Sequence, residues 1–512
     1  MPAAEFRDPE VRTTVGMVRG RTEGGLAVFR GIPYAEPPLG KARFQVPRPV
    51  RGWDGVREAY EFGPPAPQDA NMGGRGDNGL FSGTGDDWLT VNVWTPAPDP
   101  AARRPVMVWI HGGAYKHGFS GSPGYDARHI AREGDVVFVS MNYRLGVEGF
   151  ARIEGAPANR GLLDQVTALE WVQENITAFG GDPDQVTILG DSAGAGSIAS
   201  LMVMPSATGL FKRAIGQSLP GTFCSDALAR DVAAAIAAEA GLRPNVKALS
   251  GVDARELPAI GHTVESKMRQ HAARWGNFAH TLTLFSPVVD GEVLPVTPWQ
   301  GLARGAGQDV ELIIGHNRDE WRTFFLFGNL FGKVTEEQAG DALRHFGPGE
   351  EEEGERAYRE AFPDMSAEDL FEVVQSDWLF RMPALKLAEA QAAGGGKAYL
   401  YELAWQSPGH GGVLRACHGL DGPLLFGTYD AHLGPVAIGP EHVAEAEVLT
   451  SQIRSAWTSF AATGDPGWPA FDAERRLTRI FDTEPSVTAY PEEVSRRLWQ
   501  PYAFAAMPLL TS

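Results

Sequence analysis

The chain has 512 residues, 43% of them hydrophobic, and a formal net charge of −19. This composition can bury a large core, whereas the negative charge argues against nucleic acid as a partner, because no basic face is available to neutralise phosphates. Charged residues occupy the N-terminal positions where a secretory signal needs an apolar run. No stretch approaches the roughly 18 apolar residues of a membrane helix. We therefore expect a cytoplasmic protein without a membrane span.

Strand and helix patterns alternate along the chain. Apolar runs typical of buried strands occur at residues 105–110, 136–142, 186–189, 311–315 and 398–405. Apolar residues at spacings of three and four, over 161–176 and again over 446–460, indicate amphipathic helices. Together these patterns predict an α/β fold with a mostly parallel central sheet that helices cover on both faces.

The organisation of the chain indicates one large folding unit, residues 1–512. No repeat is visible, and no Pro/Gly/Ser-rich linker is long enough to mark a domain boundary. Two segments, about 221–310 and 326–395, are rich in helical patterns and poor in strand patterns. We expect them to be insertions that form a cap over the functional site.

Residues 186–199, VTILGDSAGAGSIA, run from a strand pattern through glycines into a helix pattern. Part of this stretch matches the G-x-G-x-x-A turn of dinucleotide-binding proteins, but that fingerprint needs an acidic residue about 20 positions later. No acidic residue occurs between Ser192 and Asp226. The alternative is a G-x-S-x-G elbow at residues 190–194, a sharp turn that lifts the serine hydroxyl out of the sheet. The sequence therefore favours Ser192 as a nucleophile.

A nucleophilic serine needs a histidine base, an acid that orients the histidine, and donors for the oxyanion. The strand at 105–110 ends in the sequence HGGA, residues 111–114, a small-residue loop that can offer backbone N–H groups. The expected chain order of serine, acid and histidine puts the base after Ser192, where several histidines qualify and His418 lies in a loop after a strand.

Three acidic residues are candidates for the orienting acid. Asp319 and Glu320 follow the strand at 311–315, and Asp290 lies in a separate loop. The pattern of residues alone does not choose among them.

The order of several motifs resembles the type-B carboxylesterases, the family that includes cholinesterases and bacterial para-nitrobenzyl esterases. The stretch FGGDPDQVTILGDSAG, residues 179–194, is similar to the serine motif of that family. Further similar stretches lie at residues 31–44, 86–96, 108–115, 159–176, 211–218 and 457–466. The resemblance spans nearly the whole chain and implies an α/β-hydrolase fold.

The resemblance implies a serine esterase that hydrolyses small-molecule carboxylic esters through an acyl-enzyme, without a metal or an organic cofactor. It gives the role of nucleophile to Ser192 and the role of base to His418. Through the pattern G-x-N-x-D-E at residues 315–320, it gives the role of acid to Glu320.

Other residues acquire roles from the same resemblance. The backbone N–H groups of Gly113, Ala114 and Ala193 fall where the family has its oxyanion hole. Asp191, beside the nucleophile, and Ser218, where the family has a second serine near the acid, are given supporting roles. An inactive, binding member of the family is the alternative function, but such members lose the serine.

The sequence departs from the family at informative places. Ala66 and Trp88 stand at about the positions of a disulfide in secreted members, which fits a reducing compartment. The only cysteines, Cys224 and Cys417, form no C-x-x-C and no zinc-like spacing, so neither a disulfide framework nor a metal site is predicted.

Three further departures concern the expected site. Asp191 stands where many relatives have glutamate, and Trp321 replaces the usual glycine after the acid. The loop at residues 71–83 contains Phe81 but lacks the tryptophan with which cholinesterases hold a quaternary ammonium.

Overall fold

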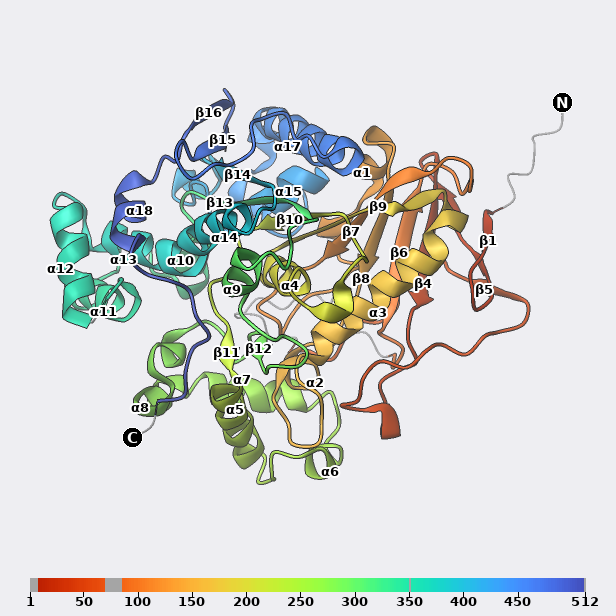
Figure 1. Ribbon diagram of the computed structural model, residues 1–512, viewed down its shortest axis with the longest axis horizontal. Helices are drawn as coiled ribbons and strands as arrows, with labels where there is room; N and C mark the ends of the chain where they lie inside the picture. Colours follow the sequence, from red (N-terminus) through yellow and green to blue (C-terminus); the bar gives the residue numbers. More distant parts are fainter. Residues whose placement is uncertain (1–7, 70–84, 350, 511–512) are drawn as a thin grey trace.

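The apolar runs of the sequence form the strands of one large sheet in the computed structural model, which describes residues 8–69, 85–349 and 351–510. Within these ranges the sheet has eleven strands in the order β16-β15-β14-β13-β10-β9-β7-β8-β6-β4-β3 (Figure 1). The strands are β3 (Arg21–Glu23), β4 (Leu26–Pro33), β6 (Thr90–Thr95), β7 (Arg104–Ile110), β8 (Val137–Met141), β9 (Gly181–Asp191), β10 (Arg213–Gln217), β13 (Glu311–Asn317), β14 (Ala398–Leu403), β15 (Leu477–Phe481) and β16 (Ser486–Ala489).

The central strands of this sheet are parallel and the strands near its edges are antiparallel. β8, β7, β9, β10, β13, β14 and β15 pair with one another in parallel. The pairs β3 with β4, β4 with β6, β6 with β8, and β15 with β16 are antiparallel. The five predicted strands are confirmed as β7, β8, β9, β13 and β14. The carboxyl ends of the central strands therefore share one edge of the sheet, where sites of α/β proteins form.

Helices cover both faces of the sheet because its buried strands are apolar on both sides. In β7, Val106, Val108 and Ile110 belong to one core cluster, while Met107 and Trp109 belong to the other. The first cluster includes residues of α3 (Arg160–Asn175), α4 (Ala193–Leu201) and α14 (Met382–Ala393). The second includes residues of α1 (Arg128–Glu133), α15 (Asp421–Phe426) and α17 (Val443–Thr463). The helices predicted at 161–176 and 446–460 are thus confirmed as α3 and α17.

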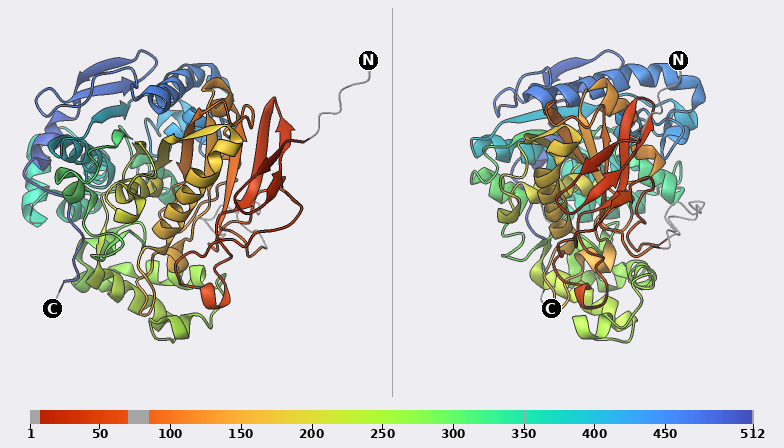
Figure 2. Two further views of the ribbon diagram at one scale, coloured as in Figure 1. Left: turned by 45° about the vertical axis from the view of Figure 1, so that its right-hand side comes forward. Right: turned by 90° about the vertical axis from the view of Figure 1, so that its right-hand side faces the viewer.

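A second, smaller sheet lies at the N-terminal side of the molecule. It consists of β1 (Glu10–Arg12), β2 (Met17–Arg19) and β5 (Val56–Glu58), in the order β1-β2-β5. Figure 2 shows these strands, in red, beside the edge of the large sheet that β3 and β4 form.

The two segments expected to be insertions are largely helical and lie at the bottom and the left of Figure 1. Residues 221–310 contain the two-stranded sheet of β11 (Cys224–Ser225) and β12 (Val288–Val289), and the helices α5 (Asp226–Glu239), α6 (Val246–Leu249), α7 (Leu257–Glu265), α8 (Ala272–Trp275) and α9 (Pro298–Ala303). Residues 326–395 contain α11 (Glu336–Phe346), α12 (Glu351–Ala361), α13 (Ala367–Ser376) and α14. Among these helices, α14 packs into the core beside the sheet.

The remaining helices are short and join these layers. They are α2 (Gly146–Phe150), α10 (Arg322–Gly328), α16 (Gly434–Ala437) and α18 (Glu493–Trp499). No helix in the described ranges combines the length and the apolar character needed to cross a membrane.

Candidate active site

Ser192 occupies the turn between β9 and α4, with φ 52° and ψ −121°. A positive φ is strained for a residue with a side chain, so the surroundings must hold this turn. The turn passes close to the end of β7: a Cβ on Gly190 would lie 2.3 Å, and one on Gly194 2.1 Å, from the Ile110 carbonyl oxygen. The Ser192 N–H also donates to the Gln217 carbonyl at 2.8 Å. The two glycines of the elbow therefore let the turn pack against the neighbouring strand.

Ser192, His418 and Glu320 form a hydrogen-bonded chain. The distance from His418 Nε2 to Ser192 Oγ is 3.0 Å, and the distance from His418 Nδ1 to Glu320 Oε2 is 2.6 Å. Because a carboxylate accepts hydrogen bonds, the Nδ1–H group of His418 donates a hydrogen bond to Glu320. Nε2 of the neutral ring is then free to accept a hydrogen bond from the Ser192 hydroxyl. The structure thus brings together the three residues of the predicted triad.

The other two candidate acids lie in different surroundings. Asp319 accepts hydrogen bonds from the Ala416 N–H and the Gln406 side chain, each at 3.3 Å. Asp290 accepts from the N–H groups of two residues in its own loop. Neither carboxylate is hydrogen-bonded to His418, whereas Glu320 is fully buried against it and accepts from the Asn317 N–H at 2.8 Å. Geometry therefore favours Glu320 over both aspartates.

The residues predicted to form an oxyanion hole lie around the elbow. Gly113 and Ala114 follow β7 with φ values of 109° and 54°, and Ala193 is the first residue of α4. The N–H groups of these three residues have no hydrogen-bond acceptor among the residues that the structure describes. Unpaired N–H groups that are held by a rigid backbone suit an anionic oxygen.

Asp191 and Ser218, the two supporting residues of the sequence prediction, differ in their contacts. Asp191 Oδ1 accepts from the Gly112 N–H at 3.0 Å, so this carboxylate ties the end of β9 to the loop after β7. Burial and, to a smaller extent, the charge of Asp421 raise the pKa of Asp191 to about 6, against the opposing effect of His418. The Ser218 N–H donates to Gly315, but its buried hydroxyl has no partner in the described part of the chain.

Asp421, which the sequence analysis did not single out, adds a third carboxylate near the histidine. It is buried and accepts from the Gln217 side chain at 2.6 Å. Asp421 stands three residues after His418, a spacing that belongs to no motif, so the sequence carries no signal for it. Burial lowers the pKa of His418, but Glu320, Asp191 and Asp421 raise it, and the balance lies above the usual value of 6.5. The carboxylates thus stabilise a protonated imidazole.

Aromatic side chains from two parts of the chain pack around the histidine. The Phe380 ring stacks on the imidazole with 4.3 Å between centroids, and the Phe324 ring lies at 5.4 Å. Phe380 belongs to a π-helical turn, Asp377–Arg381, and Phe324 belongs to α10. The Trp321 ring, next to Glu320 in the sequence, lies 4.6 Å from the Phe324 ring between centroids. The loop at 71–83 with Phe81 lies outside the described residues.

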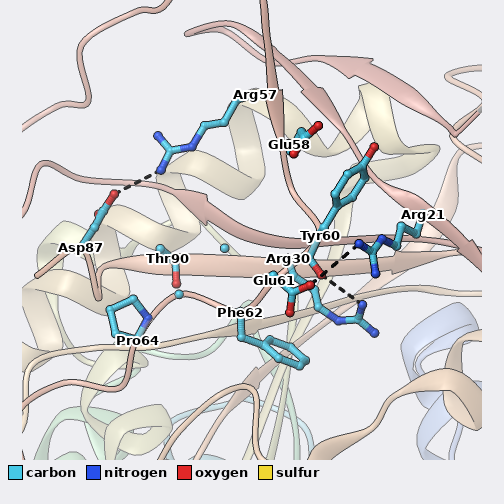
Figure 3. A pocket seen from close by; sticks show the side chains of 12 residues that line it. Arg21, Arg30, Arg57, Glu58, Tyr60, Glu61, Phe62, Pro64, Asp87 and Thr90 are labelled. Carbon is cyan, nitrogen blue, oxygen red and sulfur yellow. Dashed lines mark hydrogen bonds and ion pairs between the residues drawn. The ribbon is translucent and has the colours of Figure 1, made fainter. Parts of the chain in front are cut away.

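A hollow of about 440 Å³ lies beside β3, β4 and β5 and shares no lining residue with the triad (Figure 3). Its wall contains both signs of charge. Arg57 pairs with Asp87 at 3.2 Å, and Arg21 lies 3.9 Å from Glu61. Because these charges neutralise one another, the hollow indicates no class of ligand. No group of three His, Cys, Asp or Glu side chains within the described ranges is placed to hold a metal ion.

Comparison with known proteins gives a consistent family. The model of the "Carboxylesterase family" matches residues 7–499. The para-nitrobenzyl esterase of Bacillus subtilis (strain 168) is 36% identical in a 508-residue alignment that covers 95% of this chain and 97% of that protein. The phenmedipham hydrolase of Pseudarthrobacter oxydans is also 36% identical, over 96% of this chain and 98% of that protein. The cholinesterase of Mus musculus is 30% identical, over 93% of this chain and 83% of that protein.

Solved structures agree with these sequence relatives. A carboxylesterase from Geobacillus stearothermophilus superposes with a TM-score of 0.83 at 36% identity, and the match covers 96% of this chain and all of that one. A thermophilic para-nitrobenzyl esterase superposes with a TM-score of 0.82 at 34% identity, over 96% of this chain and 99% of that one. The large mixed sheet with helices on both faces is therefore an α/β-hydrolase fold, which confirms the predicted fold class.

Proposed function

Because the chain belongs to the carboxylesterase family and is a carboxylic ester hydrolase, we propose that it cleaves esters through an acyl-enzyme formed on Ser192. The observation that carries this proposal is the continuous hydrogen-bonded chain from Ser192 through His418 to Glu320. A serine hydroxyl needs such a base to become an effective nucleophile near neutral pH.

In the first half of the reaction, Ser192 Oγ attacks the ester carbonyl carbon while His418 Nε2 takes the hydroxyl proton. The carbonyl oxygen becomes an oxyanion, and the bond to the alcohol oxygen breaks when the tetrahedral intermediate collapses. His418 gives its proton to the departing alcohol, which leaves the acyl group on Ser192. Glu320 keeps the proton on Nδ1 and stabilises the imidazolium that forms in this step.

In the second half, water replaces the serine as nucleophile. His418 takes a proton from the water as its oxygen attacks the acyl carbon, and the same proton returns to Ser192 Oγ when the carboxylic acid leaves. We propose that the N–H groups of Gly113, Ala114 and Ala193 bind the oxyanion in both halves. Their lack of other acceptors among the described residues supports this role, and one such donor is worth about 10²- to 10³-fold in rate.

We further propose that the segments at about 221–310 and 326–395 form a cap that shapes the substrate site. Leu282 from the first segment and Phe380 from the second belong to one aromatic-rich cluster with Trp321. Because Phe380 stacks on His418, this cluster reaches the reacting groups. Such apolar walls suit uncharged esters, in agreement with a relative named para-nitrobenzyl esterase.

The test of the proposed nucleophile is the variant Ser192→Ala. We expect it to fold normally and to lose nearly all hydrolysis of p-nitrophenyl esters, because no oxygen remains for His418 to activate. A radiolabelled organophosphate should modify the wild-type protein at Ser192 and leave the variant unlabelled. The matched control is Ser200→Ala in α4, the helix that follows Ser192; among the described residues, the Ser200 hydroxyl bonds only to the Gly196 carbonyl. Ser192→Ala with more than a few per cent of wild-type turnover would refute the proposed nucleophile.

A further inference from the structure

The loop that carries two of the oxyanion donors contains a strained turn. Ala114 and Tyr115 are its central residues, with φ values of 54° and 59°. The Gly113 carbonyl closes the turn by accepting from the N–H groups of Lys116, at 3.1 Å, and His117, at 2.9 Å. Turns with two positive φ values normally use Gly, Asn or Asp, because a Cβ crowds the backbone there. Contacts from outside the turn must therefore hold Ala114 in this conformation.

One such contact comes from the segment at 221–310. Thr283, a buried residue between the helical turn η6 (Gly276–His280) and β12, donates its hydroxyl to the Ala114 carbonyl at 3.1 Å. Within the described ranges, no other side chain donates to this carbonyl. The neighbouring Tyr115 carbonyl is held separately by the Gly146 N–H at 2.7 Å.

A second contact joins the same two regions. The Lys116 ammonium group lies 2.5 Å from a Glu265 carboxylate oxygen in α7 and donates to the Leu282 carbonyl at 3.3 Å. Leu282 is the residue before Thr283, so this ion pair brings the segment against the turn. It thereby keeps the threonine hydroxyl within reach of Ala114.

These contacts fix the direction of the Ala114 N–H. In a trans peptide this N–H points opposite to the Gly113 carbonyl, whose position is set by its two backbone donors. The next peptide begins with the Ala114 carbonyl, which Thr283 holds. With the peptides on both sides of its Cα anchored, Ala114 has no freedom to relax to a negative φ and turn its N–H away.

We propose that Thr283 is a positioning residue of the oxyanion hole, which holds the N–H of Ala114 in its donor orientation through the hydrogen bond to the Ala114 carbonyl. This inference rests on the proposed oxyanion role of Ala114. An oxyanion exists only in the tetrahedral intermediates and the adjacent transition states, so the contribution of Thr283 belongs to kcat and not to substrate affinity.

The test compares Thr283→Val, which has nearly the same volume and no hydroxyl, with Thr283→Ser, which retains the donor. We expect Thr283→Val to lower kcat for a p-nitrophenyl ester about tenfold per titrated active site, less than the loss of a whole donor, with KM within about twofold. The inhibition constant of an alkyl trifluoromethyl ketone, which forms a serine hemiketal with an oxyanion, should rise by the same factor. Thr283→Ser should restore both values.

Two controls separate positioning from general loosening of the protein. Thr263→Val removes a hydroxyl that, among the described residues, bonds only within α7, and it should leave kcat unchanged.

The Thr283 hydroxyl also accepts from the Phe285 N–H at 3.1 Å, so the loss of this hydroxyl can loosen the segment at 221–310 itself. Loosening alone would change KM and the thermal midpoint without a matching change in hemiketal affinity. If Thr283→Val folds poorly, Thr283→Ala serves as the second variant for the same measurements.

The proposal is overturned if the Val and Ala variants keep kcat within twofold of the wild type, if the loss lies in KM, or if Thr283→Ser is as impaired as Thr283→Val. Each of these outcomes leaves the proposed nucleophile intact, because that role is tested separately by Ser192→Ala.

Discussion

Opposing effects of burial and of neighbouring carboxylates set the pKa of His418. Burial lowers this pKa, while Glu320, Asp191 and Asp421 raise it above 6.5. The base of the proposed mechanism must be neutral to accept the serine proton. Activity therefore falls as the pH drops through the pKa of His418, and every carboxylate that raises this pKa moves the fall to higher pH.

Asp191→Asn tests this electrostatic effect. The amide oxygen can still accept from the Gly112 N–H, but the negative charge near the imidazole is gone. The pKa of His418 should fall, so we expect the acid limb of the kcat/KM profile to move to lower pH while the alkaline side stays in place. The measurement is a pH profile with an uncharged ester. Asp319→Asn is the control, because any effect of Asp319 on the pKa of His418 is smaller than those of Glu320, Asp191 and Asp421. An equal shift in both variants would contradict this account.

Some residues of the candidate site could be predicted from the sequence and others could not. Ser192 and the HGGA loop have motif signals, because elbows and oxyanion loops constrain residue type at fixed spacing, whereas His418 is singled out among several histidines only through the family resemblance. Asp421 and Thr283 have no such signal. Their roles depend on which distant segment lies against them, Gln217 for the first and Ala114 for the second, and a local pattern carries no such information.

At the scale of elements, the contact between the elbow and β7 depends on the absence of a side chain at Gly194. A Cβ there would lie 2.1 Å from the Ile110 carbonyl oxygen, which is backbone and cannot turn aside. We expect Gly194→Ala to lower the free energy of unfolding by roughly 1–3 kcal/mol and to reduce kcat, because the displaced turn carries Ser192.

The thermal midpoint and the activity of the purified variant are the measurements. Gly251→Ala is the control, because its Cβ would meet its nearest atom at 3.4 Å, an ordinary contact, in an exposed turn. Similar thermal midpoints for the two variants would mean that β7 can move away from the elbow.

The elements themselves were predicted to different degrees. Buried strands such as β9 and amphipathic helices such as α3 have strong periodic patterns because the core selects their residues. The strand predicted at 398–405 ends at Leu403 in the structure, and the Trp405 indole instead donates to Glu445 at 2.7 Å. The π-helical turn at Asp377–Arg381 has no pattern of its own, because tertiary packing decides such irregular turns.

For the molecule as a whole, the net charge of −19 attracts cationic substrates, whereas the aromatic walls suit uncharged esters. Long-range attraction of a cation is screened at ordinary salt, whereas binding an ammonium group needs a free ring face within about 6 Å. The Phe324 and Phe380 rings are parallel with 6.1 Å between centroids, and both rings contact the His418 imidazole, so these contacts reduce the ring surface open to an ammonium group.

We therefore expect short- to medium-chain p-nitrophenyl esters to be hydrolysed with kcat/KM at least ~10²-fold above acetylcholine, a gap of about 2.7 kcal/mol. Both substrates should be measured at one salt concentration. Near parity between them would mean that this chain builds an ammonium site from other residues.

The order of the strands in the large sheet almost repeats their order along the chain, with only β7 and β8 exchanged among the described strands. A chain that grows on the ribosome can therefore add strands to the sheet from one edge to the other as they emerge. The Ser192 elbow and its neighbours β7 and β10 are complete by Gln217, but the proposed base arrives only with His418, after β14. In the growing chain, Ser192 is therefore not activated as a nucleophile until about two hundred further residues have been made and its base emerges.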